Sequence, residues 1–355
     1  MLKNKITRKP TKSIRIGNQI IGSDHPIAVQ SMIMADPKKL ETSISEIHTL
    51  EKAGCDMVRV AVPSRESAMQ LRKLKENTRL PLIADIHFDP ELALISIQQG
   101  VDKIRLNPSN IRNPLKIREV VACARDANIP IRVGANEGSL KVSDTSSSTL
   151  LDALFDAIRR EVDLLEKFNF DNIVLSAKTS NIERTIAINR MLSNSYSYPL
   201  HIGLTEAGLP AQGIVKTCLA LTPLLLEGMG DTLRFSLAGH LQEEVFAARS
   251  LLRYLDLEPG VEVIACPTCG RSRWKVAQAA ERIQEAVSHL KIKATIAVMG
   301  CEVNGPGEAR HADFGLAGTG EKVLLFEKGQ RIALGDENAM MEALLKKLST
   351  WSQSG

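Results

Sequence analysis

Three cysteines in the last third of the chain have a spacing that suits metal binding. Cys266 and Cys269 form the motif CPTCG, and Cys301 follows in the stretch MGCEVNGPGEA. On the CPTCG fragment alone, zinc is the favoured metal, because one CxxC pair is typical of a zinc knuckle. A zinc ribbon needs a second knuckle, and no second CxxC occurs. Three thiolates instead suit a [4Fe–4S] cluster, which leaves one iron for a weaker or exchangeable ligand.

A carboxylate follows Cys301 by seven residues, at Glu308. The glycines and the proline around it favour a tight turn, which could return the carboxylate to the iron that no cysteine holds. The alternative is that Glu308 caps a turn or pairs with Arg310. The remaining cysteines lie in apolar or helix-like contexts and are expected to be inert buried thiols: Cys55, Cys123 and Cys218.

Polar residues also stand at the ends of short apolar runs in the first two thirds of the chain. Four of them are arginines, and burying an arginine without an anion costs several kcal/mol. Together they predict a substrate with several negative charges, such as a phosphate or diphosphate. A structural ion pair is the alternative for any single residue. The candidate substrate-binding residues are Arg59, His87, Arg105, Asn107, Arg132, Asn136, Lys178 and Arg234.

Proton transfer needs a carboxylate or a similar group near these cations. Glu206 in LTEAG is the first candidate, because it directly follows an apolar run. Asp85 in ADIHF competes with it, although an aspartate so placed could serve only to orient an arginine.

A repeating pattern positions these residues. Eight short apolar runs are followed by longer amphipathic stretches, which predicts a (β/α)8 TIM barrel with its active site at the carboxyl ends of the strands. A hairpin is expected at 15–21 before the first barrel strand. The barrel strands are expected at 27–32, 57–62, 82–88, 102–108, 129–136, 172–178, 200–208 and 231–237.

A second, smaller α/β domain is predicted after the turn LEPG at 257–260. Strands are expected at 261–266, 294–301, 314–318 and 322–329, with helices at 274–290 and 338–351. The predicted organisation is therefore a substrate-binding TIM barrel over residues 1–258 and an iron–sulfur domain over residues 259–355.

The composition and charge argue against a nucleic-acid-binding, membrane or secreted protein. The 355 residues carry a formal net charge of +4, which is too small and too dispersed to indicate nucleic-acid binding. No apolar run approaches the ~20 residues of a membrane span, and the basic amino terminus lacks the apolar segment of a secretory signal. The expected location is the cytoplasm, where cysteines serve as metal ligands more often than in disulfides.

Seven motifs occur in order along nearly the whole chain: PIAVQSM, ADIHFD, RLNPSNI, HIGLTEAG, GDTLRFSL, ACPTCGR and GCEVNGPGEA. Taken together, they resemble, in the same order, the motifs of bacterial 4-hydroxy-3-methylbut-2-enyl diphosphate synthases of the non-mevalonate isoprenoid pathway. The resemblance implies reductive ring opening and dehydration of 2-C-methyl-D-erythritol 2,4-cyclodiphosphate with two electrons. It also implies a homodimer whose active site combines the barrel of one subunit with the cluster of the other.

By motif, the resemblance assigns the three cysteines as thiolate ligands and Glu308 as the fourth ligand. It assigns the cyclic diphosphate to Arg59, Arg105, Asn107, Arg132 and Asn136. The chain departs from the family pattern at Ile33–Met34, where a polar run is usual, and at Gly239–His240, which replaces an acidic segment.

Two other functions fit the same residues. One is a cluster-dependent hydro-lyase, in which iron acts only as a Lewis acid. The other is an iron–sulfur carrier or redox sensor attached to a phosphate-binding barrel. A requirement for stoichiometric reductant separates the reductase from both. Because no GxGxxG follows a first strand, the electrons are expected from a protein donor, either flavodoxin or ferredoxin.

Overall fold

The computed structural model describes residues 6–86, 89–106, 114–137, 149–272, 274–288, 290–301 and 309–351. The chain divides into two compact units, Met1–Leu257 and Glu258–Gly355. Each unit has its own hydrophobic core. Among the described residues, no helix is long and apolar enough to cross a membrane.

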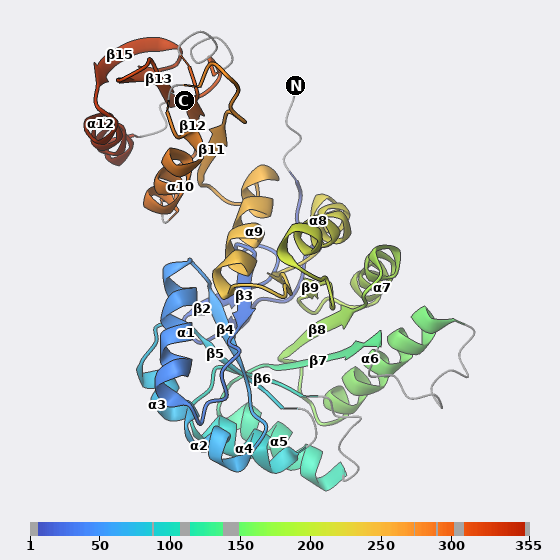
Figure 1. Ribbon diagram of the computed structural model, residues 1–355. Coiled ribbons are helices and arrows are strands. Elements are labelled where there is room, and N and C mark those ends of the chain that lie inside the picture. The colour runs from blue at the N-terminus through green and yellow to red at the C-terminus, as the bar shows by residue number, and fades with distance from the viewer. Residues whose placement is uncertain are drawn as a thin grey trace. The chain divides into compact units, whose positions relative to one another are not determined.

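The first unit is a parallel eight-stranded barrel with its helices on the outside, as the sequence predicted (Figure 1). A bridge between Leu175 and Leu200 connects the two ends of the sheet. The strands are β3 (Ala28–Met32), β4 (Met57–Ala61), β5 (Leu82–Asp85), β6 (Lys103–Arg105), β7 (Ile131–Asn136), β8 (Ile173–Lys178), β9 (His201–Gly203) and β10 (Thr232–Arg234). They pair in the order β8-β7-β6-β5-β4-β3-β10-β9.

The helices between these strands bury their apolar faces on the outside of the barrel. Helix α6 illustrates the local signals: Thr149 accepts a hydrogen bond from the Asp152 amide at its start, and apolar residues then recur along one face. The helices are α1 (Leu40–Lys52), α2 (Arg65–Met69), α3 (Leu71–Glu76), α4 (Pro90–Gln98), α5 (Pro114–Asp126), α6 (Leu150–Lys167), α7 (Ile182–Ser195), α8 (Pro210–Leu226) and α9 (Leu241–Tyr254).

Alternation along each strand separates the packing residues from the residues that face the barrel axis. In β7, the residues Ile131, Val133 and Ala135 belong to the core beneath the helices, whereas Arg132 and its alternate neighbours line a pocket inside the barrel. A strand that is apolar on one face and polar on the other therefore supplies both the core and the site.

A hairpin closes the amino-terminal end of the barrel. It consists of β1 (Ile14–Ile16) and β2 (Gln19–Ile21), which pair antiparallel around Gly17 at φ 58°. Three of its four isoleucines, Ile14, Ile16 and Ile21, share a buried cluster with residues from the starts of the barrel strands: Ala28, Met57, Ile83 and Val174. The hairpin thus forms an apolar plug, and the polar residues inside the barrel lie on the other side of it.

The second unit is a five-stranded mixed sheet. Its strands are β11 (Val261–Ala265), β12 (Ala294–Met299), β13 (Phe314–Gly318), β14 (Val323–Glu327) and β15 (Gln330–Gly335), in that order across the sheet. Strands β11, β12 and β13 are parallel, and β14 and β15 are antiparallel additions. Helices α10 (Val276–Val287) and α12 (Glu337–Ser349) contribute to one core with the sheet.

Strand β15 was not predicted from the sequence. Most of its side chains are partly or fully exposed, so the run QRIALG lacks the apolar periodicity that identifies a strand. The strand is defined by its antiparallel pairing with β14, to which it is joined by a turn at Lys328 and Gly329, both at positive φ.

Candidate functional site

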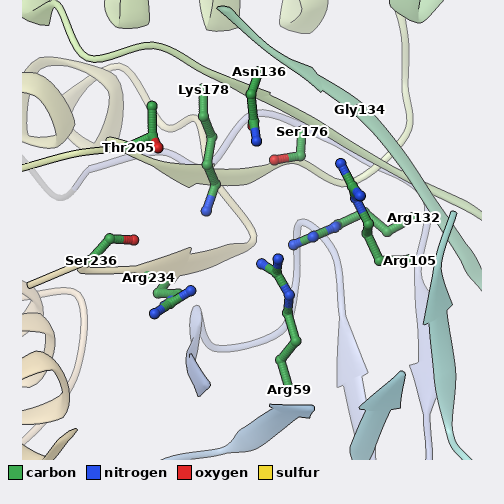
Figure 2. A pocket seen from close by; sticks show the side chains of 10 residues that line it. All are labelled: Arg59, Arg105, Arg132, Gly134, Asn136, Ser176, Lys178, Thr205, Arg234 and Ser236. Atoms are coloured by element: carbon green, nitrogen blue, oxygen red, sulfur yellow. The ribbon is translucent and has the colours of Figure 1, made fainter. Parts of the chain in front are cut away.

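A pocket of about 90 Å³ lies inside the barrel at the carboxyl ends of its strands (Figure 2). Cationic side chains from five strands converge on it, and three hydroxyl side chains lie among them. Six of the eight candidate substrate-binding residues are present, while His87 and Asn107 lie outside the described residues. The lining residues are Arg59, Arg105, Arg132, Gly134, Asn136, Ser176, Lys178, Thr205, Arg234 and Ser236.

Asp85 pairs with two of the pocket arginines. The Arg59 Nη2 donates to Asp85 Oδ2 at 2.7 Å, and the Arg105 Nε lies 3.6 Å from Asp85 Oδ1. Asp85 is 2% exposed, which makes it a buried counter-ion between β4 and β6. This geometry matches the arginine-orienting role that the sequence left open for Asp85.

Arg234 has a different counter-ion, Glu244 of α9. The Arg234 Nη2 and Nε each lie 3.2 Å from a Glu244 oxygen. Ser31 Oγ and the Leu237 amide donate to the same carboxylate, at 2.7 and 3.0 Å. Glu244 is buried and did not figure in the sequence predictions, because a glutamate within a helix carries no signal that distinguishes it from a surface residue.

The pocket therefore has an excess of positive charge. Of its five cationic side chains, Arg132 and Lys178 form no ion pair with a carboxylate in the part of the chain that the structure describes. Burial lowers the pKa of the Lys178 ammonium well below its usual value, and the charges of Arg132, Arg234 and Arg59 lower it further. A polyanion bound here would relieve this repulsion.

Two glycines bring the backbones and side chains around the pocket close together. A Cβ on Gly134 would lie 2.0 Å from the Ser176 carbonyl oxygen, and one on Gly203 would lie 2.7 Å from the Arg234 carbonyl oxygen. The Lys178 ammonium would be only 3.1 Å from a Cβ at position 203. Each glycine leaves room that even an alanine would fill.

Glu206 lies at the same end of the barrel but is not a lining residue. It lies three residues after the end of β9, has a left-handed φ of 53°, and is exposed. The neighbouring Thr205 lines the pocket instead. Glu206 thus follows a pocket residue in the sequence, and its own side chain is accessible to solvent.

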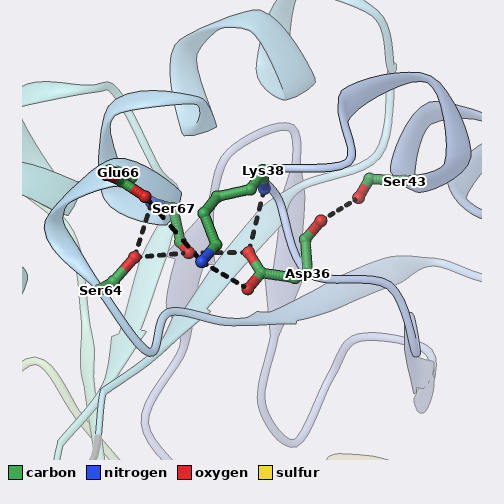
Figure 3. A network of polar contacts seen from close by, with 6 residues as sticks. All are labelled: Asp36, Lys38, Ser43, Ser64, Glu66 and Ser67. Carbon is green, nitrogen blue, oxygen red and sulfur yellow. Dashed lines mark hydrogen bonds and ion pairs between the residues drawn. The ribbon is translucent and has the colours of Figure 1, made fainter.

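The loop after β3 is held by a polar network (Figure 3). Ser67 of α2 donates to Asp36 Oδ1 at 2.7 Å, and the Lys38 amide donates to the same oxygen at 3.0 Å. Burial raises the pKa of the Asp36 carboxyl, but these hydrogen bonds and the Lys38 charge outweigh burial and lower it overall. The loops after β3 and β4 are therefore tied together next to the pocket end of the barrel.

The two departures from the family pattern lie directly after β3, at Ile33–Met34, and directly before α9, at Gly239–His240. Ile33 is 3% exposed and packs in the barrel core, whereas the Met34 side chain is 70% exposed. The amides of Met34 and Ala35 both donate to Glu46 Oε2, at 2.8 and 2.9 Å. His240 begins α9, and its amide donates to Glu243 Oε2 at 2.9 Å.

In the second unit, Cys266 and Cys301 follow the carboxyl ends of two adjacent parallel strands. Ala265 of β11 pairs with Val298 of β12, and the Cys266 amide donates to the Val298 carbonyl oxygen at 2.9 Å. Cys269 lies in the loop after β11 and is exposed. The three thiols therefore stand at one edge of the sheet.

The cysteine loop packs closely on the end of β12. A Cβ on Gly300 would lie 3.0 Å from Ser272 Oγ, and Trp274 Nε1 donates to the Met299 carbonyl oxygen at 2.7 Å. Hydrogen bonds from the Arg271 amide and side chain lower the pKa of the Cys269 thiol, which favours the thiolate.

Other cysteines have the opposite environment. Burial raises the pKa of Cys55 to about 12, and burial also raises the pKa values of Cys123 and Cys218. Only Cys55 is buried as predicted, whereas Cys123 and Cys218 are half-buried.

No set of three or more His, Cys, Asp or Glu side chains in the described residues is arranged to hold a single metal ion. Glu308 and the rest of the segment 302–308 lie outside those residues. Cys266, Cys269 and Cys301 lie in the segments that follow two neighbouring strands, and their side chains are not gathered into such a set. Three thiolates are nevertheless the donor set that suits an iron–sulfur group.

Four pocket residues were not among the eight candidates, although alternation could have found them. Ser236 stands two residues after the predicted Arg234. Gly134 and Ser176 stand two residues before the predicted Asn136 and Lys178, on the same faces of β7 and β8. Thr205 lies four residues after His201 along the same run.

Fold and site together define a two-unit α/β protein whose barrel carries a strongly cationic pocket for a small polyanion. The GcpE TIM-barrel domain model matches residues 11–249, and the GcpE protein C-terminal domain model matches residues 262–350. The chain belongs to this family, whose curated members are named 4-hydroxy-3-methylbut-2-en-1-yl diphosphate synthase (flavodoxin).

Two relatives illustrate the similarity. The synthase of Caldanaerobacter subterraneus subsp. tengcongensis is 44% identical over 96% of this chain and 97% of its own length. The synthase of Caldicellulosiruptor saccharolyticus is 45% identical over 95% of this chain and 98% of its own length. Among solved structures, 3-dehydroquinate dehydratase from Geobacillus kaustophilus matches with a TM-score of 0.51 at 11% identity, over 70% of this chain and 98% of its own. That likeness concerns the fold alone.

Proposed function

We propose that this chain catalyses the reductive ring opening and dehydration of 2-C-methyl-D-erythritol 2,4-cyclodiphosphate to 4-hydroxy-3-methylbut-2-enyl diphosphate. The reaction consumes two electrons and releases water. The observation that carries the proposal is the cationic pocket, in which five basic side chains meet the two carboxylates Asp85 and Glu244. A doubly charged diphosphate ring offsets two of the three excess positive charges, and the name of the curated relatives specifies the diphosphate product.

The substrate-binding residues in this proposal are the pocket cations together with Asn136, and His87 and Asn107 by motif. Guanidinium groups bind phosphate oxygens through paired, charge-assisted hydrogen bonds. Asp85 and Glu244 pair with other arginines of the pocket, so Arg132 and Lys178 have no carboxylate counter-ion among the described residues. Their positive charge is available to the substrate. Ser176, Thr205 and Ser236 add hydroxyl donors for the ring oxygens.

Cys266, Cys269 and Cys301 would hold a [4Fe–4S] cluster, with Glu308 as its fourth ligand. The fit rests on three cysteines that follow two adjacent parallel strands, on a Cys269 thiol whose pKa is lowered, and on Gly300, where a Cβ would lie 3.0 Å from Ser272 Oγ of the cysteine loop. When bound, such a cluster supplies electrons to the substrate.

Glu206 would transfer the proton that the departing hydroxyl needs, since it is a carboxylate in the loop that follows β9 at the pocket end of the barrel. Its exposed, left-handed position leaves its side chain accessible to solvent for proton exchange. Asp85 is the second candidate, and its contacts with two arginines favour an orienting role instead.

The electron donor in this proposal is flavodoxin, as in the names of the relatives, with ferredoxin as the alternative. The protein would act as a cytoplasmic homodimer in which the barrel of one subunit meets the cluster-binding unit of the other. This arrangement would bring the barrel pocket and the thiols together although each belongs to a separate unit of the chain.

One experiment tests the function. Anaerobically purified protein is mixed with the cyclic diphosphate and a limited amount of reduced flavodoxin, and the product is measured. We expect one product molecule for every two electrons supplied. Turnover without reductant would instead identify a hydro-lyase, and reductant oxidation without product would identify an electron carrier.

A further inference from the structure

A layer of buried polar side chains lies beneath the pocket, and neither substrate binding nor proton transfer accounts for it. Lys103, Gln30 and His201 are each at most 1% exposed. They come from β6, β3 and β9. Lys103 lies two residues before the pocket residue Arg105, so alternation places it on the same inner face, closer to the hairpin plug.

Several polar atoms of this layer have no hydrogen-bond partner among the residues that the structure describes. They are Lys103 Nζ, both amide atoms of Gln30, His201 Nε2 and the Nη1 of Arg132. The other ring nitrogen of His201 lies 2.7 Å from Thr232 Oγ1. A buried ammonium without any acceptor is far less favourable than a buried neutral amine.

The charges around Lys103 act in the same direction. Burial lowers the pKa of the Lys103 ammonium well below its usual value, and the charges of Arg132 and Arg59 lower it further. Burial and nearby cations also lower the pKa of His201. The charged or titratable groups that face the barrel interior around Lys103 are Arg59 from β4, Asp85 from β5, Arg105 from β6, Arg132 from β7, Lys178 from β8, His201 from β9 and Arg234 from β10, with Glu244 from α9 bound to Arg234.

Arginine and lysine respond differently to this crowding. An arginine keeps its proton in proteins, so the four pocket arginines stay charged whatever occupies the pocket. A buried lysine can release its proton. A change of protonation state is therefore expected at the lysines, Lys103 and Lys178. Lys103 has no access to solvent, so its charged form is the less favourable of the two.

We infer that Lys103 is a neutral amine when the pocket is empty and takes up a proton when a doubly charged phosphate compound occupies the pocket. Binding is then coupled to proton uptake, and affinity falls as pH rises. Lys103 does not line the pocket, so it is a positioning residue that acts through Arg132 and Arg59. This inference rests on the proposed use of the pocket for a cyclic diphosphate.

The first test is calorimetric. The holoenzyme is titrated with 2-C-methyl-D-erythritol 2,4-cyclodiphosphate, without reductant, at pH 8 in buffers with different ionisation enthalpies. Each phosphorus of this ligand carries one strongly acidic hydroxyl, so the ligand itself does not titrate. We expect uptake of about 0.5 proton or more per ligand bound. Lys103→Met should take up fewer protons per ligand than the wild type, because only Lys178 of the two lysines remains to respond, while Lys52→Met, at an exposed position of α1, should keep the wild-type uptake.

Binding without proton uptake, or equal uptake in Lys103→Met, would overturn the inference. If Lys103→Met does not fold, Lys103→Gln takes its place in the same titration. A failure of the cyclic diphosphate to bind at all would refute the proposed function instead, and a second measurement then decides about Lys103.

The second measurement needs no ligand. A lysine with a lowered pKa in the folded protein binds its proton only on unfolding, so stability rises with pH up to the pKa of the unfolded chain. The unfolding equilibrium of wild-type protein should shift toward the folded state by up to about tenfold per pH unit, relative to Lys103→Met, between pH 7 and 9. An unchanged difference between the two proteins across this range would show that Lys103 is charged in the fold and would refute the inference.

Discussion

The two arginines Arg59 and Arg132 allow a sharp test of the pocket's electrostatics, because they differ in their counter-ions. Arg59 pairs with Asp85 at 2.7 Å, whereas Arg132, 3% exposed, has a buried Nη1 without a partner among the described residues. Replacement of either by methionine keeps most of the side-chain volume and removes the charge. Both variants should lose affinity for the cyclic diphosphate, but their stabilities should change in opposite directions.

The magnitudes follow from these contacts. A charge-assisted hydrogen bond contributes about 1.5–3 kcal/mol, so each variant should bind the cyclic diphosphate about 10- to 150-fold more weakly. Arg132→Met removes a buried charge without a carboxylate partner and should stabilise the ligand-free protein by roughly 1–4 kcal/mol. Arg59→Met leaves the buried Asp85 with Arg105 at 3.6 Å and should destabilise it by about 1–3 kcal/mol.

Binding is measured by calorimetric titration of the oxidised holoenzyme, and stability is measured by the thermal midpoint of the ligand-free protein. The absorbance of the cluster should be the same in both variants, which controls for damage to the second unit. A loss of stability in Arg132→Met as large as that in Arg59→Met would show that Arg132 has a counter-ion. In that case the reasoning from excess positive charge would be wrong.

Three further predictions concern the cluster and the proton. Serine in place of Cys266, Cys269 or Cys301 should remove most of the bound iron and all activity, and one zinc with no iron per chain in anaerobic metal analysis would contradict this. Glu308→Ala should keep a cluster that is more labile in air and should strongly reduce turnover, and an unchanged Mössbauer signal of the unique iron would exclude Glu308 as a ligand. Glu206→Gln should reduce turnover about 100-fold or more with little change in substrate affinity, and near-normal turnover would transfer its role elsewhere.

Much of the barrel could be predicted from the sequence, because its strands are short apolar runs at regular spacing. The cationic pocket followed from them, since a position at the end of a barrel strand fixes where a side chain lies. Arg59, Arg105 and Arg132 therefore meet in the structure although 73 residues separate the first from the last.

The parts that could not be predicted depend on pairings between distant segments. Glu244 becomes the counter-ion of Arg234 because α9 packs beside β10, and nothing in EEVF distinguishes that glutamate from its neighbour Glu243. The burial of Lys103 has the same origin, since a lysine in a short strand is usually exposed at one edge. Strand β15 forms because β14 offers an edge to pair with, and its own pattern of exposed residues gives no sign of this.

The hairpin plug has a consequence for how the chain folds. Strands β1 and β2 are synthesised first, yet their isoleucines pack against residues of β3, β4, β5 and β8. The segment before the hairpin is also fixed late, because Arg8 and Thr11 both donate to Asp231, which lies just before the last barrel strand. Arg8 and Thr11 therefore cannot reach their final contacts until more than two hundred later residues have been made, and the hairpin isoleucines cannot reach theirs until Val174 has been made. Until then the apolar face of the hairpin is not covered by the barrel, and a chaperone that binds short apolar segments would have access to it.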